Sequence, residues 1–114
     1  MSSKLSLTSI LSHLELNNYI AVDLETTGLN PQKDCVTEIA ACRFIKGEFQ
    51  DQSTTLIIPG IPIPQNIVEI TGITDDMLVD APLIEDALPE LIKFLGKSPI
   101  VGHNIDFDYS FLNK

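Results

Sequence analysis

The sequence predicts an α/β protein built on a mixed β-sheet with helices packed against it. Three apolar, strand-like segments fill the first half of the chain, and segments with helical spacing of apolar residues follow. One further short apolar strand separates the last two helical segments. This order predicts three antiparallel strands and then a right-handed helical crossover, which returns a fourth strand parallel and adjacent to the first.

The first three strands are predicted from their flanking turn signals as much as from their composition. Asn30-Pro31 marks a loop after the first strand, and Lys46-Gly47-Glu48 marks a tight hairpin after the second. The proline-rich stretch that follows the third strand excludes regular structure, because proline fixes its own φ and lacks an N–H donor. The expected order is strand 19–25, loop 28–35, strand 36–45, strand 49–58 and extended connector 59–64.

Helical signals dominate the second half of the chain. Apolar residues recur on one face from Ile84 to Leu95, Gly96 suits the end of that helix, and Pro89 could kink it. The other expected elements are a helix at 65–70, a capped turn at 74–77, a short buried strand at 99–102, and a last helix that Asn104 caps and that carries Asp106 and Asp108 in its first turn.

With 114 residues the chain is expected to form one domain with a buried core. Residues 1–18 form a leader in this interpretation, either helical over residues 8–14 or poorly ordered, and residues 19–114 form the domain. No apolar run approaches the roughly 20 residues that span a bilayer. The N-terminus also lacks the pattern of a secretory signal. We therefore expect a cytoplasmic protein without membrane contact, with Cys35 and Cys42 as free thiols.

The net charge is −9, with seven basic and sixteen acidic residues. A chain with this charge does not bind nucleic acid through a general attraction between basic side chains and phosphates. It can still meet phosphates at a site that holds divalent cations, because these invert the local field.

Asp23 and Glu25 are the first candidate site. They end the first strand, two residues apart, and alternate residues of a strand share a face. Two carboxylates held so close repel each other unless a cation lies between them, and Mg²⁺ or Mn²⁺ suits oxygen ligands. The alternative is an ordinary solvated turn. The predicted topology counts against it, because it brings the helix that carries Asp108 to the same edge of the sheet, where three carboxylates would converge.

Three stretches of the chain resemble the DEDD 3′–5′ exonucleases, a family with the ribonuclease-H-like fold. They are residues 22–29 (VDLETTGL), 71–74 (TGIT) and 101–108 (VGHNIDFD). Within the family the resemblance is to the proofreading domains of bacterial DNA polymerase III, of the epsilon-subunit and Gram-positive polymerase types. It implies hydrolysis of nucleic acid, DNA rather than RNA, from the 3′ end to nucleoside monophosphates. It also implies a two-metal site in which Asp23 bridges both ions and Glu25 and Asp108 help to hold them.

The resemblance further implies contacts with the substrate. Leu29 could wedge against the terminal base or simply pack under its loop, and Asn104 could touch the substrate backbone or only cap its helix. His103 is not expected to activate water. Glu38 could support the metal ligands or be an ordinary solvated residue. The implied substrate-binding residues are Thr26, Thr27, Gly28, Leu29, His103 and Asn104.

The sequence departs from the family pattern at its C-terminal end. The third motif, a histidine followed by the fourth aspartate, does not occur before Lys114, and His13 lies too early to replace it. We therefore expect the N-terminal two-thirds of the domain, with the C-terminal part missing, a strand edge open, and little or no activity alone. Three alternatives stay open: cover of that edge by a second copy or another chain, a non-catalytic interaction module that docks onto a polymerase or helicase, and an RNA-trimming exonuclease.

Overall fold

The computed structural model describes residues 18–102 and 105–113 of the chain. The helix expected at residues 8–14 and the cap expected at Asn104 lie outside the described residues. The elements are β1 (Asn18–Thr26), β2 (Val36–Ile45), β3 (Glu48–Leu56), α2 (Gln65–Thr71), the 3-10 helix η1 (Asp75–Leu78), α3 (Ile84–Leu95), β4 (Ile100–Val101) and α4 (Ile105–Leu112).

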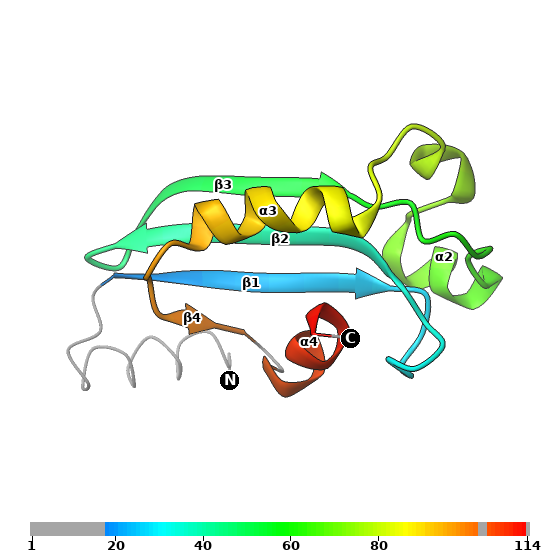
Figure 1. Ribbon diagram of the computed structural model, residues 1–114, viewed down its shortest axis with the longest axis horizontal. Coiled ribbons are helices and arrows are strands. Elements are labelled where there is room, and N and C mark those ends of the chain that lie inside the picture. Colours follow the sequence, from blue (N-terminus) through cyan, green and yellow to red (C-terminus); the bar gives the residue numbers. More distant parts are fainter. Residues whose placement is uncertain (1–17, 103–104, 114) are drawn as a thin grey trace.

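The four strands form one mixed sheet in the order β3-β2-β1-β4 (Figure 1). β1 pairs antiparallel with β2, and β2 pairs antiparallel with β3. β4 returns beside β1 in the parallel direction, with Ile20 opposite Ile100 and Ala21 opposite Val101. The predicted fold class is therefore confirmed, including the crossover that places the fourth strand next to the first.

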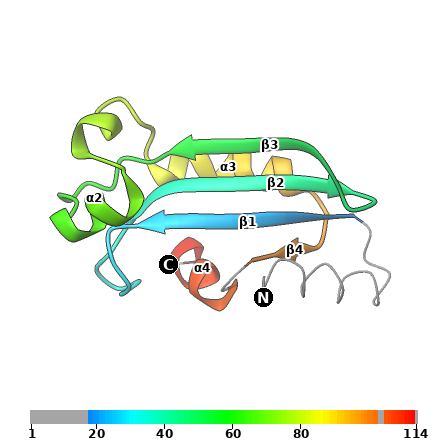
Figure 2. The ribbon, with the colours of Figure 1, turned by 180° about the vertical axis from the view of Figure 1, so that it is seen from behind.

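The core lies on one face of this sheet. Ile20, Val22 and Leu24 alternate along β1 and are buried against α3 and α4, which contribute Leu91 and Phe111 to the same cluster. In the reverse view of Figure 2 the strands lie nearer the viewer and α3 lies behind them. Each such side chain contributes roughly 1.5–3 kcal/mol when it is fully buried. Because strand residues alternate between faces, this burial turns Asp23 and Glu25 to the opposite face.

The hairpin between β2 and β3 is as tight as the sequence predicts. Lys46 and Gly47 both have positive φ, 54° and 77°. Such a turn matches the right-handed twist of the flanking strands. The pairing shifts once, between Arg43 and Phe44, and from there runs to Glu38 opposite Leu56 at the far end of β2 and β3.

Two strand predictions are wrong in detail. β3 ends at Leu56, two residues earlier than expected. The Ile57 N–H still donates to the Thr37 carbonyl of β2 at 2.8 Å, and the Ile58 N–H, on the other side of the chain, donates to the Pro82 carbonyl at 2.9 Å. The strand expected to be buried at 99–102 has only two paired residues, and Ile100 is 44% exposed. β4 lies at the edge of the described sheet, where only β1 pairs with it, and an edge strand is covered less completely than an inner one.

The helices agree with the sequence more closely. α2 ends at Gly72, whose left-handed φ of 76° lets its N–H reach the Val68 carbonyl. The turn expected after Thr74 is η1. α3 runs through Pro89 and ends before Gly96, which has φ 54°. None of the described helices is long and apolar enough to cross a membrane.

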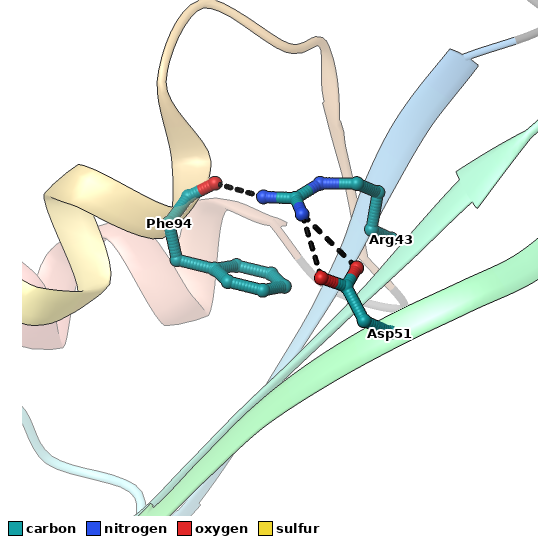
Figure 3. Close-up of polar contacts among 3 residues, drawn as sticks. All are labelled: Arg43, Asp51 and Phe94. Carbon is teal, nitrogen blue, oxygen red and sulfur yellow. Dashed lines mark hydrogen bonds and ion pairs between the residues drawn. The ribbon is translucent and has the colours of Figure 1, made fainter.

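Arg43 ties α3 to the two strands beneath it (Figure 3). From β2 its guanidinium makes two hydrogen bonds to the Asp51 carboxylate on β3, at 2.8 and 3.0 Å. It also donates to the Phe94 carbonyl at 2.7 Å and lies 4.2 Å from the centre of the Phe94 ring. The carbonyls of the last helical turn have no partner within the helix, so Arg43 satisfies one of them. We call this group the Arg43 clamp.

Candidate metal and nucleotide site

Asp23 and Glu25 lie on the face of β1 that is turned away from the core. Leu24 between them is 7% exposed and belongs to the core, which holds the register of the strand. Asp23 is exposed and Glu25 is half-buried. The structure thus brings together the first two carboxylates that the sequence singles out.

Glu38 joins this pair from β2. It is the direct cross-strand partner of Glu25 and is half-buried. The pKa of Glu25 is raised above its ordinary value, first because burial disfavours the charged carboxylate and then because Asp23 and Glu38 repel it. Glu38 thus lies beside the candidate site and is not fully solvated, and its support of metal ligands stays a prediction.

Asp108 lies on α4, which runs beside the C-terminal half of β1 in both views (Figures 1 and 2). Its side chain is 6% exposed, while Asp106 in the same turn is exposed. Among residues 18–102 and 105–113, no three His, Cys, Asp or Glu side chains are grouped so that they could hold a metal ion. The convergence of Asp108 on the other two carboxylates therefore stays a prediction.

The segment after β1 forms a loop with its own hydrogen bonds. The Thr26 hydroxyl donates to the Gly28 carbonyl at 2.6 Å. Thr27 is 1% exposed, and its hydroxyl accepts the Cys35 N–H at 3.0 Å. The Thr27 N–H in turn donates to the Cys35 carbonyl at 2.8 Å, so the loop closes against the start of β2. The residues predicted to meet the terminal nucleotide therefore have a fixed backbone.

Leu29 lies at the end of this segment and is 84% exposed. The alternative in which Leu29 packs under its loop is therefore wrong. An exposed apolar side chain in the loop that follows a carboxylate pair offers a surface on which a base could stack. His103 and Asn104, the other predicted substrate contacts, lie outside the described residues.

Asp34 is the residue of this region that the sequence interpretation missed. Its carboxylate accepts the Thr27 hydroxyl at 3.1 Å and the Asn30 N–H at 3.0 Å. The available signal was the composition of the loop, since Asn and Asp in a turn bind backbone N–H groups close by in sequence. Nothing in the sequence alone paired Asp34 with Thr27.

The fold and this site define a protein of the exonuclease class. Residues 20–114 match the RNase T-type exonuclease family. The match covers most of the chain, and the chain belongs to this family.

Individual relatives agree with this assignment. The chain is 42% identical over 96 residues to the DNA polymerase III subunit epsilon of Aquifex aeolicus, a match that covers 84% of this chain and 48% of the relative. It is 46% identical over 101 residues to the PolC-type DNA polymerase III of Thermotoga petrophila, covering 89% of this chain and 7% of the relative. The chain thus spans about half the length of the first relative and a small part of the second.

Solved structures show the same fold. Exonuclease X, in a complex with 5′ overhanging duplex DNA, superposes with a TM-score of 0.72 at 33% identity and covers 82% of this chain and 53% of its own. Exonuclease I superposes with a TM-score of 0.73, covering 84% of this chain and 23% of its own. At 21% identity the likeness to exonuclease I is one of fold alone. The expected ribonuclease-H-like architecture is confirmed.

The residues present fit a divalent cation in part. Asp23, Glu25 and Glu38 offer only carboxylate oxygens, which are the ligands of hard cations such as Mg²⁺ and Mn²⁺. The pKa of Glu25 is raised first by burial and then by repulsion from Asp23 and Glu38, and a cation bound beside them would oppose both effects. The fit is partial because these carboxylates come from the neighbouring strands β1 and β2 alone. Within the described part of the chain they do not form a complete three-residue metal group.

Proposed function

We propose that this chain is part of a 3′–5′ exonuclease domain that hydrolyses nucleic acid from its 3′ end, DNA in preference to RNA. In this proposal Asp23, Glu25 and Asp108 hold Mg²⁺ or Mn²⁺, and residues 26–29 hold the terminal nucleotide. A bound divalent cation would neutralise the phosphate charge and supply Lewis acidity at the scissile bond.

The crowding of carboxylates around Glu25 is the observation that carries the proposal. Burial and two neighbouring acidic residues raise the pKa of Glu25. Perturbed pKa values of this kind cluster at functional sites, whereas an ordinary surface carboxylate is solvated and has no such neighbours. A cation that binds there removes the repulsion among these groups. Glu38 would then stabilise the bound cation through its charge, from the strand beside Glu25.

The loop after β1 supports the assignment of the substrate. Its backbone is fixed by hydrogen bonds, and it presents the exposed Leu29 four residues after Glu25 in the sequence. Bases stack on exposed apolar and aromatic groups with little dependence on sequence, as an enzyme that removes any terminal nucleotide requires. DNA is proposed because the relatives include DNA polymerase III proteins and a solved relative is in complex with DNA.

A replicative polymerase is the proposed partner. The chain carries a net charge of −9, so it gains little from bulk attraction to nucleic acid. An assembly that already holds the primer end would deliver it to this site. One relative is the epsilon subunit of DNA polymerase III, and another is a PolC-type DNA polymerase III.

Titration with Mn²⁺ tests the metal site, with Asp23→Asn as the test variant and Asp76→Asn as a matched control. Asp76 is an exposed aspartate on η1, so both variants lose one carboxylate charge. We expect the wild-type chain and Asp76→Asn to bind Mn²⁺ alike, and Asp23→Asn to bind at least tenfold more weakly. Equal binding by all three proteins would contradict the proposal.

A gel assay with 5′-labelled single strands of DNA and RNA tests the reaction. The expected result is slow stepwise shortening from the 3′ end, in keeping with the weak activity expected of this chain alone, faster on DNA, that Asp23→Asn abolishes and Asp76→Asn keeps. Equal cleavage of DNA and RNA would overturn the assignment of the sugar.

A module that binds nucleic acid without cutting it is the second candidate. It is favoured by the finding that the described carboxylates do not form a complete three-residue metal group. Binding of a single strand in the absence of Mn²⁺, with affinity unchanged in Asp23→Asn and with no cleavage, would support it over the exonuclease.

A further inference from the structure

The carboxylate of Asp34 bridges two separate points of the loop that follows β1. One oxygen accepts the Thr27 hydroxyl at 3.1 Å, and the other accepts the Asn30 backbone N–H at 3.0 Å. These two donors flank Gly28 and Leu29 in the sequence. One side chain therefore holds both ends of the segment that is proposed to meet the terminal nucleotide.

Asp34 is itself held in place by the backbone. Its N–H donates to the Asn30 carbonyl at 2.7 Å. Its neighbour Cys35 exchanges hydrogen bonds with Thr27, through the Thr27 hydroxyl at 3.0 Å and through the Thr27 N–H at 2.8 Å. The carboxylate thus belongs to a connected network rather than to a single surface hydrogen bond.

Gly28 packs directly against this carboxylate. A Cβ atom placed on Gly28 would lie 2.4 Å from one Asp34 carboxylate oxygen and 2.8 Å from the other. A flexible side chain could move away, but the Asp34 carboxylate is tied by two hydrogen bonds. Glycine at position 28 is therefore a condition for the close approach of Asp34.

We propose that Asp34 is a positioning residue for the 3′-terminal nucleotide. It acts through the loop: it fixes the backbone from Thr26 to Gly28 and holds Leu29 exposed, so that the surface for the terminal base exists before the substrate binds. A loop that is ordered in advance loses less conformational entropy on binding. That the bound group is a nucleotide rests on the proposed function. That Asp34 fixes the loop rests on the hydrogen bonds and the packing described above.

Binding of a 5′-fluorescein-labelled oligothymidylate tests the inference by fluorescence anisotropy, with Ca²⁺ as the cation. Loss of a stacking surface weakens single-strand binding by about tenfold, which we expect for Leu29→Ala. Asp34→Ala should weaken binding to a similar degree. The double variant should bind at most about twofold more weakly than either single variant. Once the loop is released, Leu29 no longer lies where it can contact the base, so its removal costs little more.

Asp51→Ala is the control for a merely structural role. It breaks the Arg43 clamp, and Asp51 aligns across β2 with Ile20, six residues before Thr26 or roughly 20 Å along the strand. Any fold-loss of affinity that Asp51→Ala causes should multiply with the fold-loss caused by Leu29→Ala, because the two residues are not coupled. Asp34→Asn should restore most of the affinity, because its amide can accept the Asn30 N–H and donate to the Thr27 hydroxyl oxygen.

Amide hydrogen exchange reports the loop independently of any substrate. The amides of Asn30 and Cys35 should exchange at least tenfold faster in Asp34→Ala, while amides of the β2–β3 pair stay protected. Gly28→Ala should accelerate the same two amides, and less so in the Asp34→Ala background, where the carboxylate that meets the new methyl group is gone.

The outcomes separate the two proposals. A wild-type chain that does not bind the oligothymidylate would overturn the proposed function and with it the role of Asp34 in binding. Binding by wild type with unchanged affinity in Asp34→Ala, or penalties of Asp34→Ala and Leu29→Ala that multiply, would overturn the positioning role alone. Unchanged exchange of Asn30 and Cys35 in Asp34→Ala would overturn the fixing of the loop.

Discussion

Glu25 and Glu38 lie directly opposite each other on neighbouring antiparallel strands, and both are half-buried. Like charges at such a cross-strand pair destabilise a sheet by roughly 0.2–1 kcal/mol. The sheet thus carries an electrostatic cost at the place where the exonuclease proposal needs negative charge.

Glu38→Gln should raise the free energy of unfolding by roughly 0.5 kcal/mol in metal-free buffer at neutral pH, because it removes one of two facing charges. Urea denaturation measures the difference. Glu48→Gln is the control, since Glu48 is exposed and pairs with Ile45 rather than with a carboxylate. An equal gain in both variants would show that general charge reduction, and not the facing pair, is responsible.

The raised pKa of Glu25 sets the sign of its pH dependence. Its carboxyl has an ordinary value of 4.5, and the folded value is higher. Between the two values the folded chain binds more protons than the unfolded chain, so stability falls as pH rises through this window and stays level above it. Glu25→Gln should remove this contribution. Thermal unfolding from pH 4 to 8 measures it, and identical slopes in wild type and variant would contradict the assignment.

Thr37→Val should stabilise the fold by about 1 kcal/mol. Thr37 is 1% exposed, and its hydroxyl has no hydrogen-bond partner among the described residues. Valine keeps the shape of the side chain and removes the cost of a buried, unpaired polar group. Chemical denaturation measures the gain. Thr37→Ser, which keeps the hydroxyl and loses a methyl group, should destabilise instead; a loss of stability in Thr37→Val would show that the hydroxyl is satisfied.

The Arg43 clamp predicts an order of stability among three variants. Asp51→Ala removes one partly exposed ion pair and should cost about 1 kcal/mol or less. Arg43→Ala also removes the hydrogen bond to the Phe94 carbonyl and the contact with its ring, and should cost about 2 kcal/mol. Arg43→Lys should fall between them, because an ammonium cannot replace the planar fork. Calorimetry checks the order, and equal losses in both alanine variants would contradict it.

The sheet was predictable because its signals are local and repeated. Alternation in β1 and the turn chemistry of Lys46-Gly47 give the antiparallel strands, and the handedness of crossovers places β4 beside β1. The end of β3 was missed because the apolar run continues through Ile57 and Ile58, although the strand ends at Leu56. No local pattern marks that end before Pro59.

The site was predictable only where strand geometry decides it. Asp23 and Glu25 share a face by alternation alone, and their register with β2 adds Glu38. The exposure of Leu29 and the role of Asp34 depend on how the loop closes over Gly28. Loop closure is set by a few specific hydrogen bonds rather than by periodicity, so sequence patterns left it undetermined.

The Arg43 clamp has a consequence for how a strand of nucleic acid would be held. Arg43 is the only arginine in the chain, and it is engaged with Asp51 and Phe94. Backbone phosphates must then be met by lysines, by N–H groups or by bound cations. Because few condensed counterions would be released on binding, the affinity for an oligonucleotide should vary only weakly with KCl concentration.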